Sequence, residues 1–139
     1  MSSKGDFELS DLARLNYERD NSHVWGNYFE VTVNPYLIVR CLSFYPRGAT
    51  SLHSHSPEEL LLVTHGTVHV SLGIKPDKLD SDILGVGQTI FIPSGYYHRV
   101  EHIGDSGEAS RALELMSKSE PGDYDIRRAS GAVPGIVSG

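Results

Sequence analysis

The stretch GATSLHSHSPEELLLVTHG, residues 48–66, decides the fold and the candidate chemistry of this 139-residue chain. His53 and His55 are separated by one residue, so both side chains point to the same face of a strand. Glu59 follows four residues after His55. Imidazole and carboxylate groups are common ligands of first-row divalent metals. The stretch therefore predicts a strand that presents a metal site.

Around this stretch, short runs of β-branched and aromatic residues alternate with Gly, Pro, Asp and Ser. Such spacing predicts an all-β domain, either a sandwich or a barrel. The expected strands cover residues 24–33, 36–45, 49–55, 59–64, 67–74, 82–84, 88–92, 97–103 and 109–116. Leucines at helical spacing before them predict a short N-terminal helix over Phe7–Tyr17.

The same patterns predict how the chain is organised. We expect one domain with a flanking segment at each end. The N-terminal extension is expected at 1–23, the barrel at 24–118 and a polar C-terminal extension at 119–139. From Ala129 onward the chain lacks periodicity, so its end is predicted to be a loose tail or an extension that docks on a partner.

A second stretch, GQTIFIPSGYYH at residues 87–98, completes a pattern with the first. Together they resemble the two motifs of the cupin superfamily, Gly-x4or5-His-x-His-x3-Glu-x6-Gly and Gly-x5-Pro-x-Gly-x2-His. The resemblance implies a small cupin barrel, that is, a double-stranded β-helix or jelly roll. It also implies one divalent transition metal ion per chain, Zn, Mn, Fe or Ni. The implied ligands are His53, His55, Glu59 and His98.

One position departs from the family pattern. Four residues beyond His98, where cupins often carry Asn, this chain has His102. Both histidines share a face of strand 97–103, but they lie roughly 13 Å apart along it at about 3.3 Å per residue, too far to share an ion. We therefore predict that His102 contacts substrate or acts as the general base, rather than binding the metal.

The chain also loosely resembles the cupin domain of type II mannose-6-phosphate isomerases. The similar segments are Trp25–Tyr28, Leu37–Arg40, Leu113–Leu115 and Asp125–Arg127, although those enzymes carry Gln at the position of His53. This resemblance implies a metal-dependent isomerase that acts on a sugar or sugar phosphate through an enediol. Two alternatives stay open: an iron dioxygenase with three His and one Glu, and a cupin that binds a small molecule without catalysis.

Arg40 is a candidate substrate-binding residue. If the face that it shares with Ile38 and Leu42 lines the barrel, its guanidinium requires an anion. That anion is either a phosphate or carboxylate of the substrate or a neighbour of Glu59. The alternative is a surface arginine on the other face.

Composition restricts the partners. The chain has a net charge of −6, so it lacks the positive potential that nucleic acid or an anionic membrane requires of a partner. A small-molecule substrate is the expected partner. Cys41 is the single cysteine, so the chain has no internal disulfide, which fits a reducing, cytoplasmic location. We expect Cys41 to be a buried, inert thiol. Leu60 and Leu62 point away from the face of Glu59 and would be exposed in a monomer. We therefore predict a homodimer in which a second copy covers them.

Overall fold

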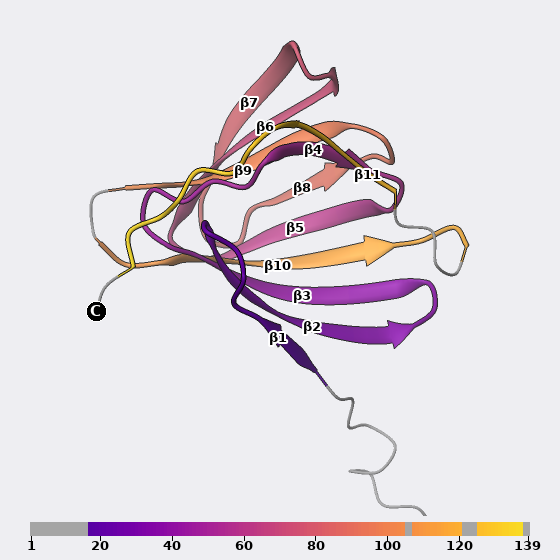
Figure 1. The fold of residues 1–139 in the computed structure, drawn as a ribbon, viewed down its shortest axis with the longest axis horizontal. Coiled ribbons are helices and arrows are strands. Elements are labelled where there is room, and N and C mark those ends of the chain that lie inside the picture. Colours follow the sequence, from indigo (N-terminus) through magenta and orange to yellow (C-terminus); the bar gives the residue numbers. More distant parts are fainter. Residues whose placement is uncertain (1–16, 105–106, 121–124, 138–139) are drawn as a thin grey trace, which may run out of the picture.

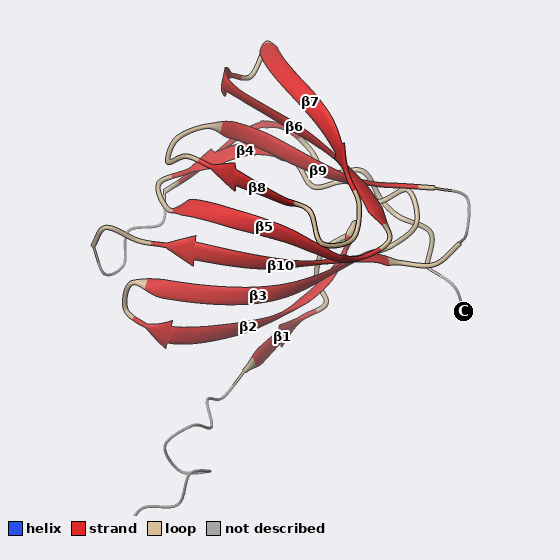
Figure 2. Ribbon diagram, turned by 180° about the vertical axis from the view of Figure 1, so that it is seen from behind, coloured by secondary structure: helices blue, strands red, loops and turns tan. Residues whose placement is uncertain are grey.

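The computed structural model describes residues 17–104, 107–120 and 125–137, and these residues form strands and loops without a helix (Figure 2). The strands are β1 (Glu18–Asp20), β2 (Gly26–Asn34), β3 (Leu37–Phe44), β4 (Leu52–His55), β5 (Glu58–His65), β6 (Thr67–Lys75), β7 (Lys78–Leu84), β8 (Thr89–Ile92), β9 (Tyr97–Ile103), β10 (Ser110–Ser117) and β11 (Ile126–Ser130). The all-β prediction is confirmed. Except for Tyr17, which is not helical, the expected N-terminal helix lies outside the described residues.

Two antiparallel sheets face each other. One has six strands in the order β1-β2-β3-β10-β5-β8, and the other has five in the order β11-β4-β9-β6-β7. Figure 1 shows these two layers, with β2, β3, β10 and β5 side by side in the first and β4, β9 and β6 in the second. In the part of the chain described here, we find no helix with the length and hydrophobicity needed to cross a membrane.

The hydrophobic core lies between the sheets because each strand alternates its side chains. On β5, Leu61 and Val63 are fully buried, whereas Leu60 on the opposite face is 39% exposed. Val68 and Val70 of β6 bury the matching face of the other sheet. The predicted alternation on this strand is therefore confirmed, with one face in the core and one on the outside.

The structure differs from the predicted strands at three places. β7 begins at Lys78 instead of residue 82, because pairing with β6 extends it through a polar segment without β propensity. β1 and β11 were not predicted. β11 pairs with β4, and Val133 exchanges two backbone hydrogen bonds with Ala49. The chain from Ala129 to Val133 is therefore held on the sheet rather than loose, since backbone pairing needs no hydrophobic pattern.

The contact between β4 and β9 places the two histidine-containing stretches, residues 48–66 and 87–98, together. Its ladder contains one pair, His53 opposite His98. Just beyond the start of β4, the buried Thr50 adds two further bonds: its backbone N donates to the carbonyl oxygen of Val100 at 2.9 Å, and its Oγ1 accepts from the backbone N of Val100 at 3.0 Å. Thr50 thus holds the histidine strands in register.

We predict that Thr50→Val destabilises the protein by about 1–3 kcal/mol, because it leaves the buried N–H of Val100 without an acceptor. Urea unfolding measures the change. Thr32→Val, at an exposed threonine of β2, is the matched control and should have little effect. Equal stability of the two variants would show that the Thr50 hydroxyl does not hold β4 on β9.

Candidate metal centre

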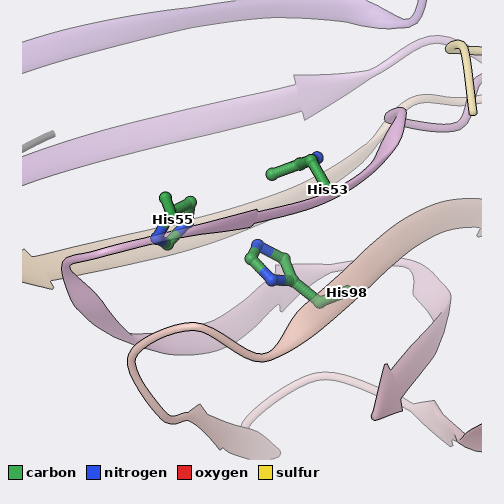
Figure 3. Close-up of side chains that lie close together, drawn as sticks. All are labelled: His53, His55 and His98. Atoms are coloured by element: carbon green, nitrogen blue, oxygen red, sulfur yellow. The ribbon is translucent and has the colours of Figure 1, made fainter. Parts of the chain in front are cut away.

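Three imidazoles from two neighbouring strands converge between the sheets. His53 and His55 lie on alternate positions of β4, and His98 lies opposite His53 on β9 (Figure 3). One ring nitrogen from each lies within 4.8 Å of those of the other two. The ring centroids of His53 and His98 are 4.4 Å apart. The structure therefore brings together three of the four predicted ligands as one cluster.

A hydrogen bond to a backbone carbonyl orients each ring. Nδ1 of His53 donates to Ser51 O at 2.8 Å, Nδ1 of His55 to Pro57 O at 2.7 Å, and Nδ1 of His98 to Tyr96 O at 3.1 Å; each of the three acceptors lies two residues from the histidine it binds. Because a carbonyl oxygen only accepts, the proton of a neutral ring must be on Nδ1. Each Nε2 then carries a lone pair, which is the state a metal ligand requires.

Glu59, the fourth predicted ligand, enters the cluster from β5 in the opposite sheet. Its Oε1 lies 2.9 Å from Nε2 of His55 and 3.3 Å from Nε2 of His98. Its Oε2 is buried without a hydrogen-bond donor in the described part of the chain. The carboxylate therefore has oxygen lone pairs inside the same cluster as the imidazole nitrogens.

These residues fit a divalent ion. With each Nδ1 proton bound to a carbonyl, the Nε2 atoms and Glu59 Oε1 are all acceptors, and acceptors at 2.9 and 3.3 Å repel unless a proton or a cation lies between them. Nitrogen and oxygen ligands of this kind suit Mn, Fe, Ni and Zn. A bound ion would be held by His53, His55, His98 and Glu59.

Burial sets the charge states in the metal-free cluster. It lowers the pKa of His53 to about 3, with a further contribution from the charge of His98, so this ring is neutral. Burial alone would raise the pKa of Glu59, but hydrogen bonds with His55 and His98 outweigh it and hold the pKa well below its usual range. A neutral His53 and an ionised Glu59 are the forms in which these two residues can bind a metal.

Behind Glu59 lies a second buried carboxyl, that of Glu114 on β10. Burial, followed by the negative charge of Glu59, raises the pKa of Glu114 well above its usual range. Glu114 is therefore a neutral acid beside the ionised Glu59. Arg40 lies beyond it, with Nη1 3.5 Å from Glu114 Oε1 and Nε 2.6 Å from Glu30 Oε1. Glu59 thus lies beside a row of three ionisable groups, of which Glu114 is buried and Arg40 and Glu30 are partly buried.

A cavity of about 340 Å³ gives access to the cluster from the side of His53. Its wall combines hydroxyl groups, aromatic rings, aliphatic side chains and two arginines. The residues other than His53 are His23, Trp25, Tyr28, Arg40, Leu42, Thr50, Ser51, Ile126, Arg128, Gly131 and Ala132. A small polar molecule with some apolar surface would fit such a wall.

Residues 42–113, which include both histidine stretches, match the Cupin domain family. The chain belongs to the cupin family. No curated protein sequence matches it.

Solved structures show the same fold. The vicilin of Corylus avellana (hazelnut) superposes with a TM-score of 0.69 at 17% identity, over 83% of this chain and 35% of its own. A Bacillus subtilis oxalate decarboxylase studied for its Mn(II) centres superposes with a TM-score of 0.65 at 19% sequence identity, over 74% of this chain and 28% of its own. A vicilin from Solanum lycopersicum (tomato) superposes with a TM-score of 0.68 at 18% sequence identity, over 86% of this chain and 35% of its own. This cupin therefore spans about a third of the length of these proteins, and the likeness concerns the fold.

The predicted catalytic histidine of this cupin lies at the other end of β9. His102 is 5% exposed, and its Nδ1 bonds Ser110 Oγ at 2.9 Å. It borders a separate cavity of about 730 Å³ with His65 and Thr67, and it does not line the cavity over His53. A role for His102 in proton transfer stays a prediction.

Arg40 faces the interior and is not a surface arginine on the other face of β3. Its guanidinium carbon lies 4.6 Å from the ring centre of Tyr28, and its charge partners are Glu30 and Glu114. One of the two anions foreseen, a neighbour of Glu59, is therefore present in the chain itself. Contact with a substrate stays a prediction.

Sequence reasoning missed the two residues that add polar groups to the cavity wall from outside the predicted barrel strands. Arg128 lies on β11 opposite His53 of β4, in a segment whose composition did not predict a strand. His23 lies before β2 and stacks on Trp25 with ring centroids 5.1 Å apart. The sequence does contain a signal for the burial of Glu114, because residues two apart share a strand face and Glu114 lies between the core residues Ala112 and Met116.

We predict about one divalent ion per chain after reconstitution. His55→Ala should lower metal affinity by more than the roughly 10–100-fold that loss of a ligand's hydrogen-bond partner costs. Elemental analysis and titration calorimetry with Mn, Fe, Ni and Zn measure both quantities. His69→Ala, at a partly exposed histidine on β6, is the matched control and should bind metal like the wild type. Wild-type stoichiometry in His55→Ala would overturn the assigned centre.

We also predict that the metal-free protein loses stability in acid. An unfolded His53 takes up a proton below its ordinary pKa of 6.5, whereas the folded ring takes it up only near 3. In this window the unfolded state binds more protons, so the free energy of unfolding falls as the pH falls. His53→Gln should make this dependence shallower in urea titrations, and His69→Gln should not. Parallel pH profiles for all three proteins would contradict the assignment.

Proposed function

We propose that this cupin is a metal-dependent isomerase that interconverts the aldose and ketose forms of a small sugar or sugar phosphate. The observation that supports it is a set of oriented imidazoles, with Nε2 lone pairs and Glu59 converging, beneath a cavity that contains hydroxyl groups and a guanidinium. When bound, a divalent ion would act as a Lewis acid on adjacent carbonyl and hydroxyl oxygens. The remaining tasks fall to side chains of the cavity wall.

Substrate binding is the first of these tasks. The hydroxyls of Thr50 and Ser51 line the cavity and match the hydroxyl groups of a sugar. Trp25 and Tyr28 offer apolar ring faces to its C–H groups. Arg128, at the same wall, offers a guanidinium fork to a phosphate or carboxylate. This combination favours a hydroxylated substrate with one anionic end.

Proton transfer between two adjacent carbons is the second task, and it requires a base that reaches the cavity. His23 lines the cavity, and its Nε2 lies 3.5 Å from Oδ2 of Asp20. Hydrogen bonds from Ser22 lower the pKa of Asp20 to about 2, so this carboxylate is ionised. This carboxylate can orient the His23 ring. For the cavity over His53 we propose His23 for proton transfer in place of the predicted His102, because His102 borders the cavity at the other end of the barrel.

An iron-dependent dioxygenase is the second candidate. Imidazole and carboxylate ligands also suit non-haem iron. Leu42 and Ile126 make part of the cavity wall apolar, which favours a less hydroxylated substrate. A cupin that only binds a ligand is the third candidate, and a vicilin of Solanum melongena, reported with different anionic ligands in structurally similar pockets, has the same fold.

We expect the metal-loaded protein to exchange aldose and ketose forms of a sugar phosphate without oxygen. Incorporation of solvent deuterium next to the carbonyl, followed by NMR over a panel of pentose and hexose phosphates, measures the reaction. His23→Gln should retain metal and lower kcat by about 10²–10⁴-fold, the range that general acid–base catalysis contributes. Arg128→Gln should raise KM for phosphorylated substrates only. Arg127→Gln, at the exposed neighbour that pairs with Asp125, is the control.

Three outcomes separate the candidates. Deuterium exchange that needs metal and no oxygen supports the isomerase. Oxygen uptake that depends on iron and on an organic substrate, without exchange, would replace it with the dioxygenase. Metal binding with neither reaction across the panel would leave a cupin that binds its ligand without catalysis.

A further inference from the structure

The segment 126–136, which we call the C-terminal strap, runs alongside the histidine strand β4 (Figure 1). Its first part is β11, whose register places Ile126 opposite His55 and Arg128 opposite His53. Two of the three clustered imidazoles therefore lie on the strand that pairs with the strap.

Backbone hydrogen bonds also hold the strap beyond β11. The backbone N of Gly135 donates to Val24 O at 3.0 Å, and the backbone N of Ile136 donates to Pro46 O at 2.8 Å. Both sequence neighbours of Val24 line the cavity over the metal centre. The end of the strap thus supports a second part of the cavity wall.

The strap itself forms a third of that wall. Four of the twelve residues that line the cavity belong to it: Ile126, Arg128, Gly131 and Ala132. Ala132 also packs against the hydrophobic core cluster that contains Trp25. None of the four candidate metal ligands lies on the strap. The strap is therefore a wall of the cavity and supplies no ligand of the metal centre.

We propose that the C-terminal strap sets the size of the molecule that reaches the metal centre, with Ala132 as the specificity-determining residue. The cavity volume of about 340 Å³ is near the lower end of the range for ligand pockets, about 300–1,000 Å³. A larger side chain at Ala132 would take up part of that volume. The substrate is then a single sugar unit rather than a chain of them. This size limit rests on the proposed function, whereas the role of the strap as a wall does not.

Gly135 is the point at which the strap can be displaced without changing the residues that line the cavity. A Cβ on Gly135 would overlap the Cβ of Tyr45 and would lie 3.1 Å from Pro46 O. Only glycine allows the strap to lie this close to the backbone at Tyr45 and Pro46. A side chain at position 135 must therefore lift the end of the strap from the barrel.

Trp25, the single tryptophan of the chain, is the probe. It lines the cavity and is 7% exposed, so acrylamide quenching of its fluorescence in the metal-free, full-length chain measures opening of the wall. Gly135→Val should raise the quenching constant about fivefold, the factor by which loss of one hydrogen bond shifts a local opening equilibrium. Gly85→Val is the matched control, since the nearest atom to a Cβ there is Gln88 Oε1 at 3.8 Å, and should be quenched like the wild type.

Ile136→Pro displaces the strap more gently and serves if Gly135→Val does not fold. It removes the N–H that donates to Pro46 O, at a side chain that is 55% exposed. Quenching should rise in the same direction. Wild-type quenching of Trp25 in the folded variants would overturn the strap as the wall of the cavity.

Ala132→Leu tests the size limit. It should lower acrylamide quenching of Trp25 below the wild-type value, because the larger side chain fills the cavity that both residues line. In the metal-loaded protein it should raise KM for hexose phosphates by roughly 10-fold, more than for pentose phosphates, with kcat unchanged. Unchanged quenching, or equal changes of KM, would overturn the role of Ala132. If no sugar phosphate reacts with the wild type, the proposed function fails, and the quenching of Trp25 still decides whether the strap is the wall.

Discussion

One hydrogen bond per ring, from Nδ1 to a carbonyl oxygen two residues away, is the constraint on which the candidate centre depends. Ser51, Pro57 and Tyr96 supply the carbonyls, and all three residues lie in the turns and loops next to the strands rather than in the strands themselves. Turn geometry thereby sets the tautomer of each imidazole. Without these bonds, the proton of a neutral ring could sit on Nε2, and the ring could not act as a ligand on that side.

The ionised carboxylate of Glu59 is tolerated in the interior because the ionisable groups near it take different charge states. Glu30, Arg40 and Glu114 are register partners across β2, β3 and β10, so three neighbouring strands align them in one row. Two carboxyls buried side by side cannot both ionise cheaply, and their pKa values move apart. Glu59 takes the charge because imidazoles face it, and Glu114 keeps its proton. Arg40 balances Glu30 and is thereby held against the ring of Tyr28.

The alternation of strand side chains lets one sheet carry two surfaces. On β10, Glu114 faces the buried row behind the metal centre, while its neighbours Leu113 and Leu115 face outward. A slip of one residue in the register would exchange these sets, burying leucines beside Glu59 and exposing the carboxyl. The row of acidic groups beside the metal centre and the outward row of leucines are therefore fixed by the same pairing of β10 with β3 and β5.

Local sequence patterns determined most of the strands and the candidate ligands. Period-two alternation identified the inward Glu59, Leu61 and Val63, because burial on one face leaves a pattern readable over a few residues. It did not identify β11 or its Arg128, since that strand is held by backbone hydrogen bonds to β4, which leave no hydrophobic signature.

Tertiary structure alone decided which residues share a cavity. His98 and His102 look equivalent in the sequence, yet one meets His53 and the other meets Ser110, because a strand spans the whole barrel and its two ends open into different spaces. Cys41 has an apolar neighbourhood in the sequence and still lies outside, because parity says which residues share a face but not which face the core covers. Only the packing of the two sheets makes that choice.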